Sequence, residues 1–503
     1  MAAPGDGEGG TAPLDVEKVG THATEEAHDQ EVPIRKAVTA QDWAGPDDPE
    51  NPMNWPFGKK VFHTLIPAMS GFTVTLGSSI ITPAVPDLRE QFNVGSTVAI
   101  LSLTLYVLGL AFGPVLAAPL SESRGRSVVY QASLPVFGLF MMGAGLAPNF
   151  ATLAICRFFA GMFGSPPLAV GAGTNADLWA RESGAIASSL FILAPFLGPA
   201  LGPTIGGFVV ERKGWRWTQY TVIFFAIFCI LCSLSISETY QKTILQRRAK
   251  RLGIPPPPAG LSGVAAIGFL FRVTLARPVH MLVTEPIVGF FSLYVAFNFA
   301  VLFSFFAAFP YVFQSVYHFN IGETGLTFLA LGLGSTVAAG VVILLDRTFY
   351  RKQHHAAKRD GRGGVVAPEH RLYAAMLGSF MLPVGLFWFA WTARPEVHWI
   401  SPVLAAIPFA FGNLLIFVSC VLYLIDTYAA LNSASALAAN GLLRYLLGAV
   451  FPLFTLPMYS RLGIGWATSL LGFIALALLP IPWVLLRWGP QIRSKSGYDT
   501  IQA

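Results

Sequence analysis

The chain has 503 residues, of which 54% are hydrophobic and only 12% are charged. A soluble globular domain carries roughly 25% charged residues, so the composition excludes an ordinary water-soluble fold and indicates a surface solvated largely by lipid. The formal net charge of +6 comes from basic loops between apolar stretches, and it is no argument for nucleic-acid binding.

Long apolar stretches follow one another along the chain, each near the roughly 20 residues that a helix needs to cross a bilayer. Proline and glycine recur inside them, as transmembrane helices tolerate. We expect twelve spans, at 61–83, 96–118, 128–147, 151–173, 184–209, 217–236, 285–309, 323–345, 372–392, 399–425, 433–456 and 466–487. The sequence therefore predicts an all-α membrane protein of twelve transmembrane helices.

The spans fall into two groups of six, which predicts two six-helix halves. The expected organisation is an acidic, glycine-rich disordered tail (1–60), an N-terminal half (61–237), a charged linker loop (238–284), a C-terminal half (285–487) and a short tail (488–503). Signals recur at corresponding positions, such as a basic, glycine- and tryptophan-containing turn after the fifth and eleventh spans. Parallel duplication of this kind is typical of transporters in which substrate binds between two rocking halves.

The distribution of basic residues predicts the orientation. About 25 of the lysines and arginines fall on the side that holds both termini and about six on the other side, so the positive-inside rule places both termini in the cytoplasm. We expect a plasma-membrane protein, with the vacuolar membrane as the alternative.

Several short motifs occur in a fixed order between residues 46 and 487. They are Asp48-Pro49-Glu50-Asn51-Pro52-Met53-Asn54-Trp55 before the first span, Ala118-Pro119-Leu120-Ser121-Glu122 with Gly125-Arg126 after the second, Leu153-x-x-x-Arg157-x-x-x-Gly161 in the fourth, Asn175-Ala176-Asp177-Leu178-Trp179 after it, Gly198-x-x-x-Gly202-Pro203-x-x-Gly206-Gly207 in the fifth and Ser237-Glu238-Thr239-Tyr240 after the sixth. Together they resemble the major facilitator superfamily and, within it, the fungal twelve-span drug:proton antiporters near the polyamine and multidrug exporters.

The loop after the second span suggests a cytoplasmic gate. Gly125 allows a tight turn, Glu122 and Arg126 flank it, and Asp177 lies at the cytoplasmic end of the fourth span. The resemblance implies that these charges lock the halves together on the inside and separate when the halves rock apart. The alternative is ordinary positive-inside charge that satisfies loop ends.

The glycines of the fifth span recur at four-residue spacing and give a bare helix face that lets another helix approach closely. The set is Gly198, Gly202, Pro203, Gly206 and Gly207. The resemblance associates this motif with antiport, since tight packing seals leak pathways. Simple helix packing is the alternative, and both can hold at once.

Two residues are candidates for proton coupling. Arg157 lies about seven residues inside its span, where an unpaired guanidinium costs roughly 2.5–3.5 kcal/mol, so we expect it to face the cavity between the halves. The resemblance ties this position to proton coupling; a structural salt bridge or carbonyl clamp is the alternative. Glu285, near the cytoplasmic end of the seventh span, is the acid we assign as proton carrier, against an interfacial side chain that reaches water.

The substrate cavity is predicted from polar side chains inside the spans of the C-terminal half: Tyr294, Asn298, Asn413, Asn440 and Arg444. No carboxylate lies plainly at the midplane, which disfavours polycations such as polyamines. Neutral or anionic amphiphiles among a largely apolar lining fit better.

No phosphate-binding loop, catalytic triad or metal-ligand spacing stands out, so the sequence predicts neither an enzyme nor an ATP-driven pump, and we expect no cofactor and no metal. The favoured function is a proton-coupled exporter of small organic molecules: secondary metabolites, toxins or drugs of a fungal cell. An organic-acid or polyamine transporter of the same fold is one alternative, and a non-transporting membrane sensor is another. The expected partners are a small-molecule substrate, protons and the lipid bilayer, with no nucleic acid, and we expect a monomer.

Overall fold

The computed structural model describes residues 42–179, 184–255, 275–360 and 366–500, where the regular structure is helical apart from one isolated bridge between Tyr428 and Thr500. Eleven segments of this part are long and apolar enough to cross a membrane. The last of them, Asn432–Arg493, contains two spans, because the chain turns at Gly463 with φ 75° and ψ 161°. The expected twelve-helix, two-half architecture is confirmed.

Broken helices build two of the six spans in the N-terminal half. The spans are α1 (Phe57–Ser79) with α2 (Val85–Phe92), α3 (Ser96–Arg124), α4 (Arg126–Gly145), α5 (Phe150–Gly164) with α6 (Pro166–Leu178), α7 (Gly184–Lys213) and α8 (Arg216–Leu234). Proline explains the break of the fourth span, since Pro166 has no N–H to continue the ladder of α5. Between α3 and α4 the chain turns at Gly125, whose φ of 101° suits glycine.

The C-terminal half repeats this plan. Two linker helices, α9 (Gln241–Leu252) and α11 (Arg277–Thr284), precede α12 (Pro286–Tyr317), α13 (Ile321–Leu326) with α14 (Leu329–Leu345), α15 (Arg351–Arg359), α16 (Leu372–Thr392), α17 (Ile400–Thr427), α18 (Ala430–Leu478) and α19 (Ile481–Arg493). Helix α12 extends eight residues beyond the expected end of the seventh span. Polar Gln314 and Ser315 lower the hydropathy there, but the helix continues until His318, whose φ is 58°.

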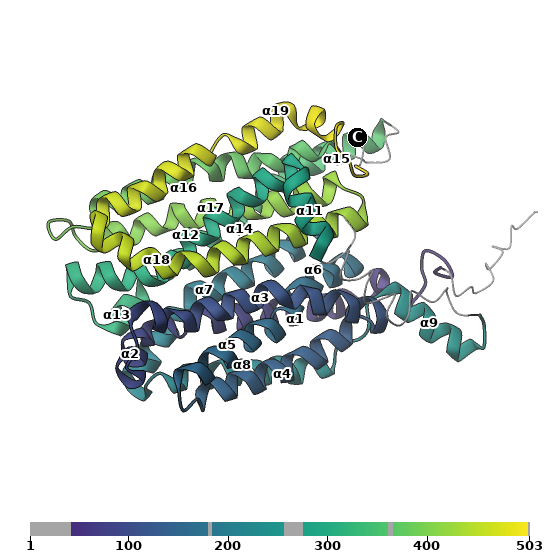
Figure 1. The fold of residues 1–503 in the computed structure, drawn as a ribbon. Coiled ribbons are helices and arrows are strands. Elements are labelled where there is room, and N and C mark those ends of the chain that lie inside the picture. Colours follow the sequence, from purple (N-terminus) through teal and green to yellow (C-terminus); the bar gives the residue numbers. More distant parts are fainter. Residues whose placement is uncertain (1–41, 180–183, 256–274, 361–365, 501–503) are drawn as a thin grey trace, which may run out of the picture.

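The two halves lie side by side, purple to blue and green to yellow in Figure 1. They meet where α7 packs against α13 and α14 and where α3 packs against α18. The same view shows α9, α15 and the C-terminal tail at one end of the bundle, which we call the linker end, and α2 and α13 at the opposite end, the far end.

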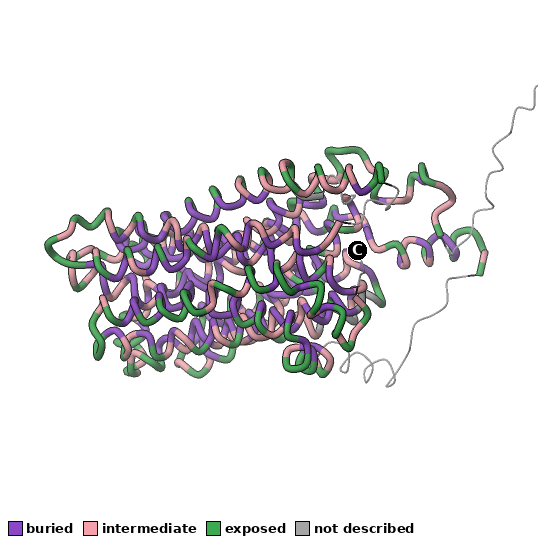
Figure 2. The backbone as a smooth tube through the Cα atoms, turned by 90° about the horizontal axis from the view of Figure 1, so that it is seen from above, coloured by how far each residue is buried: buried purple, intermediate pink, exposed green. Residues whose placement is uncertain are grey.

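The outside of the bundle is apolar. On α8, Phe224, Phe228 and Leu231 follow a helical spacing and are 62%, 54% and 61% exposed. Figure 2 shows buried segments through the interior and exposed ones mainly along the outer helices and loops. Exposed apolar surface of this extent is what a lipid-facing helix requires.

The end of the N-terminal tail is ordered, although we expected disorder throughout 1–60; residues 1–41 lie outside the described part. Arg248 of α9 binds Asp48 at 2.8 Å and Glu50 at 2.5 Å, and Arg251 also pairs with Glu50. Burial raises the pKa of Asp48, but N–H donors and the Arg248 guanidinium outweigh it and hold that pKa below its usual value. These acids therefore fasten the pre-membrane motif to the linker. No observation tests the other predicted domain boundaries, which remain predictions.

Candidate functional site

The linker end of the N-terminal half holds a polar cluster centred on Arg126. Its guanidinium binds Asp177 of α6 at 3.3 Å and donates to Ser121 Oγ at 2.7 Å, and it lies over the Tyr240 ring at 4.8 Å. Thr239 Oγ1 also donates to Asp177, at 3.3 Å. The structure thus brings together Arg126 and Asp177, as the motif predicted.

The carboxylate that completes this cluster is Glu238. It accepts the N–H of Arg126 at 2.8 Å and both the N–H and the hydroxyl of Ser127, at 3.2 and 2.7 Å, so it caps the start of α4. Gly125 is needed beside it, because a Cβ there would lie 2.2 Å from a Glu238 oxygen. Sequence reasoning noted the Ser237–Tyr240 motif but gave it no role. The side chain of Glu122, the acid predicted instead, lies outside the described residues.

A related cluster that we did not predict lies in the C-terminal half. Arg371, just before α16, binds Asp426 at the end of α17 at 2.7 Å and Asp346 at 3.3 Å, and Arg493 binds Glu369 at 3.0 Å. In each half, an arginine at the start of the third span therefore holds an aspartate at the end of the fourth. The duplication of the two six-helix halves could have predicted this pairing from the sequence.

At the far end, the glycine motif of α7 packs against two different neighbours, one on each face of the helix. A Cβ on Gly198, Gly202 or Gly206 would lie 2.1 Å or less from Thr75 and Ser79 side chains or 2.2 Å from the Ile80 carbonyl, so this face packs directly on α1 and the turn after it. Such distances leave no room for any side chain.

The other face of α7 meets the C-terminal half. Thr204 Oγ1 donates to the Gly325 carbonyl at 2.7 Å, and the Gly322 N–H donates to Glu211 at 3.1 Å. A Cβ on Gly207 would lie 2.9 Å from the Ile321 carbonyl, and one on Gly325 would lie 2.6 Å from the Pro203 carbonyl. We call this contact the α7–α13 seam. Within the described residues, both hydrogen bonds between the halves belong to it. A cavity of about 240 Å³ lies beside it, and its lining includes Thr82, Arg89, Pro203, Tyr311 and Gln314.

Arg157 is fully buried inside the N-terminal half. Its guanidinium donates to the carbonyls of Gly77, Ser78 and Ser102 at 2.6, 3.0 and 2.9 Å and lies over the Tyr106 ring at 4.3 Å. The helical ladder of α1 ends with the Ile80 N–H on the Leu76 carbonyl, so Arg157 supplies donors to the next two carbonyls. It lines neither described cavity, and this arrangement is the carbonyl clamp rather than a residue facing the cavity.

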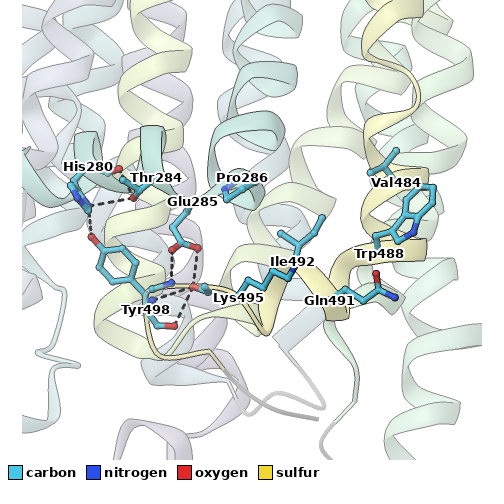
Figure 3. A pocket seen from close by; sticks show the side chains of 12 residues that line it. His280, Thr284, Glu285, Pro286, Val484, Trp488, Gln491, Ile492, Lys495 and Tyr498 are labelled. Carbon is cyan, nitrogen blue, oxygen red and sulfur yellow. Dashed lines mark hydrogen bonds between the residues drawn. The ribbon is translucent and has the colours of Figure 1, made fainter.

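Glu285 lies at the linker end, at the start of α12, and its carboxylate holds the C-terminal tail (Figure 3). It accepts from Tyr428 OH and Ser496 Oγ at 2.9 and 2.8 Å and from the Gly497 N–H at 3.0 Å. Burial and the neighbouring carboxylate raise the pKa of Tyr428, so its hydroxyl remains a donor. This geometry favours an anchor for the tail over a proton carrier.

The docked tail, Ser496–Thr500, is named the tail strap here. Tyr498 OH lies 2.8 Å from His280 Nδ1, and the Asp499 carbonyl accepts the Ala429 N–H at 3.2 Å. The strap therefore joins α11, the start of α12 and the α17–α18 connection. A cavity of about 970 Å³ opens beside it, lined on one side by Val484, Trp488 and Ile492 of α19 and on the other by His280, Thr284 and Glu285.

The predicted cavity residues divide into two groups. None of the five lines either described cavity. Tyr294, Asn298 and Asn413 are buried inside the C-terminal half, and polar atoms of all three have no hydrogen-bond partner in the described structure. Asn440 and Arg444 lie on α18, where Asn440 donates to Cys420 Sγ at 3.5 Å and Arg444 lies among aromatic rings. Within the described residues, no hydrogen bond or ring contact joins any two of the five.

Known proteins supply a separate line of comparison. Residues 68–452 match the Major Facilitator Superfamily. The chain is 42% identical to Polyamine transporter 4 of Saccharomyces cerevisiae over 92% of its length and 74% of that protein. It is 41% identical to the Major facilitator superfamily multidrug transporter mdrA of Aspergillus fumigatus, over 90% of this chain and 74% of that one.

A solved structure shares the fold. The proton:xylose symporter XylE superposes with a TM-score of 0.63 over 86% of this chain and 97% of its own, at 14% identity. The twelve helices in two halves, the family match over residues 68–452 and the identity to these transporters lead to one conclusion: the chain belongs to the major facilitator superfamily, and it is a membrane transporter, not an enzyme.

Proposed function

We propose that this protein exports small organic molecules in exchange for protons. The observation that carries the proposal is the α7–α13 seam at the far end, where the glycine- and proline-containing face of α7 forms both described hydrogen bonds between the two halves. A carrier that couples two fluxes must never open at both ends together. In the seam, the close approach of the two backbones and the hydrogen bonds of Thr204 and Glu211 hold one end closed. The relative named as a multidrug transporter supports small organic molecules as the substrates.

The proposed orientation places the linker end in the cytoplasm of a plasma-membrane protein, with the vacuolar membrane as the alternative. The basic loops support it, since α9 and α15 both lie at this end. In a variant without native cysteines, a membrane-impermeant maleimide added to intact cells should label Glu396→Cys, in a loop of the far end, and not Lys250→Cys in α9. Labelling of Lys250→Cys alone would reverse the orientation.

The described contacts of the clusters around Arg126 and Arg371 stay within one half each, so neither cluster locks the two halves together as the expected gate would. Each fixes the linker ends of the third and fourth spans within one half, so each half moves as a rigid body while the α7–α13 seam opens and closes. We also propose that the protein acts as a monomer, without nucleic acid.

Polyamine transport is the second candidate, favoured by the 42% identity to a polyamine transporter. The positions of the charged residues within the spans argue against polyamine transport. Every Asp and Glu of the described spans lies within three residues of a helix end, and the cation Arg444 lies near mid-membrane. A polyamine would meet repulsion there without acids to bind it.

The test uses inside-out vesicles with an acidic lumen, which should accumulate an exported substrate, together with protein-free liposomes as the control. Spermidine, the cationic dye rhodamine 6G and the aromatic anion 1-naphthoate cover the candidate classes. We expect uphill accumulation of at least one probe, abolished by a protonophore. Accumulation that is insensitive to the protonophore contradicts proton exchange, and no accumulation of any of the three contradicts export of these classes.

A further inference from the structure

Arg444 occupies an aromatic box at the middle of the molecule. Its guanidinium carbon lies 4.6 Å from the centroid of the Phe299 ring, 4.8 Å from that of Phe417 and 4.6 Å from that of Tyr445. Arg444 follows the start of α18 by 14 residues, or about 21 Å of helix, which places it near mid-membrane. Ring faces attract a cation but do not neutralise it.

Both halves of the transporter contribute to this box. Phe196 of α7 packs against Phe299 of α12 and Phe417 of α17, with ring centroids 5.6 and 5.2 Å apart. These are the same two rings that flank the guanidinium. Relative motion of the halves therefore changes the enclosure of Arg444, as a binding site in an alternating-access carrier requires.

The guanidinium has no counter-charge within the described part of the chain. No ion pair there includes Arg444, and its Nε is buried without a hydrogen-bond partner. Arg157 differs in this respect, because three backbone carbonyls accept hydrogen bonds from its guanidinium. The Arg444 side chain is half-buried, and like Arg157 it lines neither described cavity. With ring faces beside it and no counter-charge among the described residues, its cation needs an anion or water.

We propose that Arg444 binds the single negative charge of an aromatic or otherwise apolar substrate, such as an aromatic carboxylate. A planar guanidinium offers paired donors that match a carboxylate, and Phe196, Phe299 and Phe417 supply the surface for a flat apolar body. One unpaired cation selects one negative charge. This inference rests on the proposed export function and names its substrate class.

The test compares two probes that differ in one group. The anion 1-naphthoate and the neutral 1-naphthamide share the same ring system, and their proton-driven accumulation is measured in inside-out vesicles from cells carrying wild type, Arg444→Gln, Arg444→Lys or Arg461→Gln. Arg461 is an exposed arginine on α18 toward the far end and serves as the matched control. Binding of 1-naphthoate to purified protein, measured by its fluorescence, gives a second readout that needs no transport.

We expect Arg444→Gln to lower kcat/KM and affinity for 1-naphthoate by about ten- to a hundredfold, the value of a hydrogen bond to a charged group, while 1-naphthamide and Arg461→Gln change little. Arg444→Lys should recover part of the loss, because ammonium keeps the charge but not the fork of donors.

Three outcomes overturn the inference while export itself stands: naphthoate transport that ignores Arg444→Gln, equal loss for both probes in a variant that still folds, or wild-type transport of spermidine or rhodamine 6G but not of 1-naphthoate. Absence of any proton-driven transport by wild type instead contradicts the proposed function.

Discussion

The carbonyl clamp predicts that Arg157 stabilises the fold, and this role can be distinguished by experiment from a role in proton coupling. Arg157→Met keeps most of the side-chain length and removes every donor. The carbonyls of Gly77 and Ser78, which the ladder of α1 leaves open, then have no partner inside the bundle. The carbonyl of Ser102 loses its second donor.

The size of the effect follows from two opposing terms. Three hydrogen bonds from a charged donor contribute about 1.5–3 kcal/mol each. Removing a charge from the membrane interior has the opposite effect and stabilises the protein by roughly 3 kcal/mol on the insertion scale. The net loss of stability is then about 2–6 kcal/mol, which is large beside the 5–15 kcal/mol typical of folded proteins. Arg157→Lys should lose less, since its ammonium still reaches one carbonyl.

The assay is thermal unfolding of the purified protein in detergent, followed by tryptophan fluorescence, next to proton-driven transport at a temperature where the variant is folded. Arg461→Met, on an exposed arginine, is the control for loss of charge alone. A clamp predicts a lowered melting temperature for Arg157→Met. A variant that melts with wild type yet no longer responds to the pH gradient would refute the clamp and restore Arg157 as a coupling residue.

Three further predictions concern the other contacts. Glu238→Gln and Arg126→Gln should each lower the initial transport rate about tenfold, and the double variant should lose less than both together, because the residues share one cluster; additive losses in vesicle uptake would contradict this. Gly207→Leu should push the α7–α13 seam apart and raise proton leak in liposomes, whereas Gly340→Leu, at a glycine with open space around it, should not. Glu285→Gln should weaken the hold on the tail strap and speed its proteolysis about tenfold, with transport retained; unchanged proteolysis would show that the carboxylate is not the anchor.

Local patterns predicted the fold well, because each span needs only its own apolar length. They also placed Arg126 and Asp177 together, since both lie at span ends on the same side. Glu238 was missed for a physical reason: its role depends on the end of the sixth span returning to the start of the third, 112 residues earlier. Nothing in the local sequence encodes that approach.

The role of Glu285 could not be predicted from the local sequence either. A lone acid near a span end looks available to protons, but its partners come from residues 428 and 496–497, more than 140 positions away. For α7, the four-residue glycine spacing predicted one bare face. The second face, which meets α13, could not be foreseen, because it depends on how the two halves dock.

The tail strap bears on how the protein can be handled in the laboratory. Thr500, the last described residue, forms a bridge with Tyr428. A fluorescent reporter or affinity tag joined shortly after Thr500 would therefore begin next to the docked strap, and its bulk would compete with docking. At the other end, 41 residues precede Asp42, the first described position. Reporters for localisation and purification accordingly belong at the N terminus, or behind a long spacer at the C terminus.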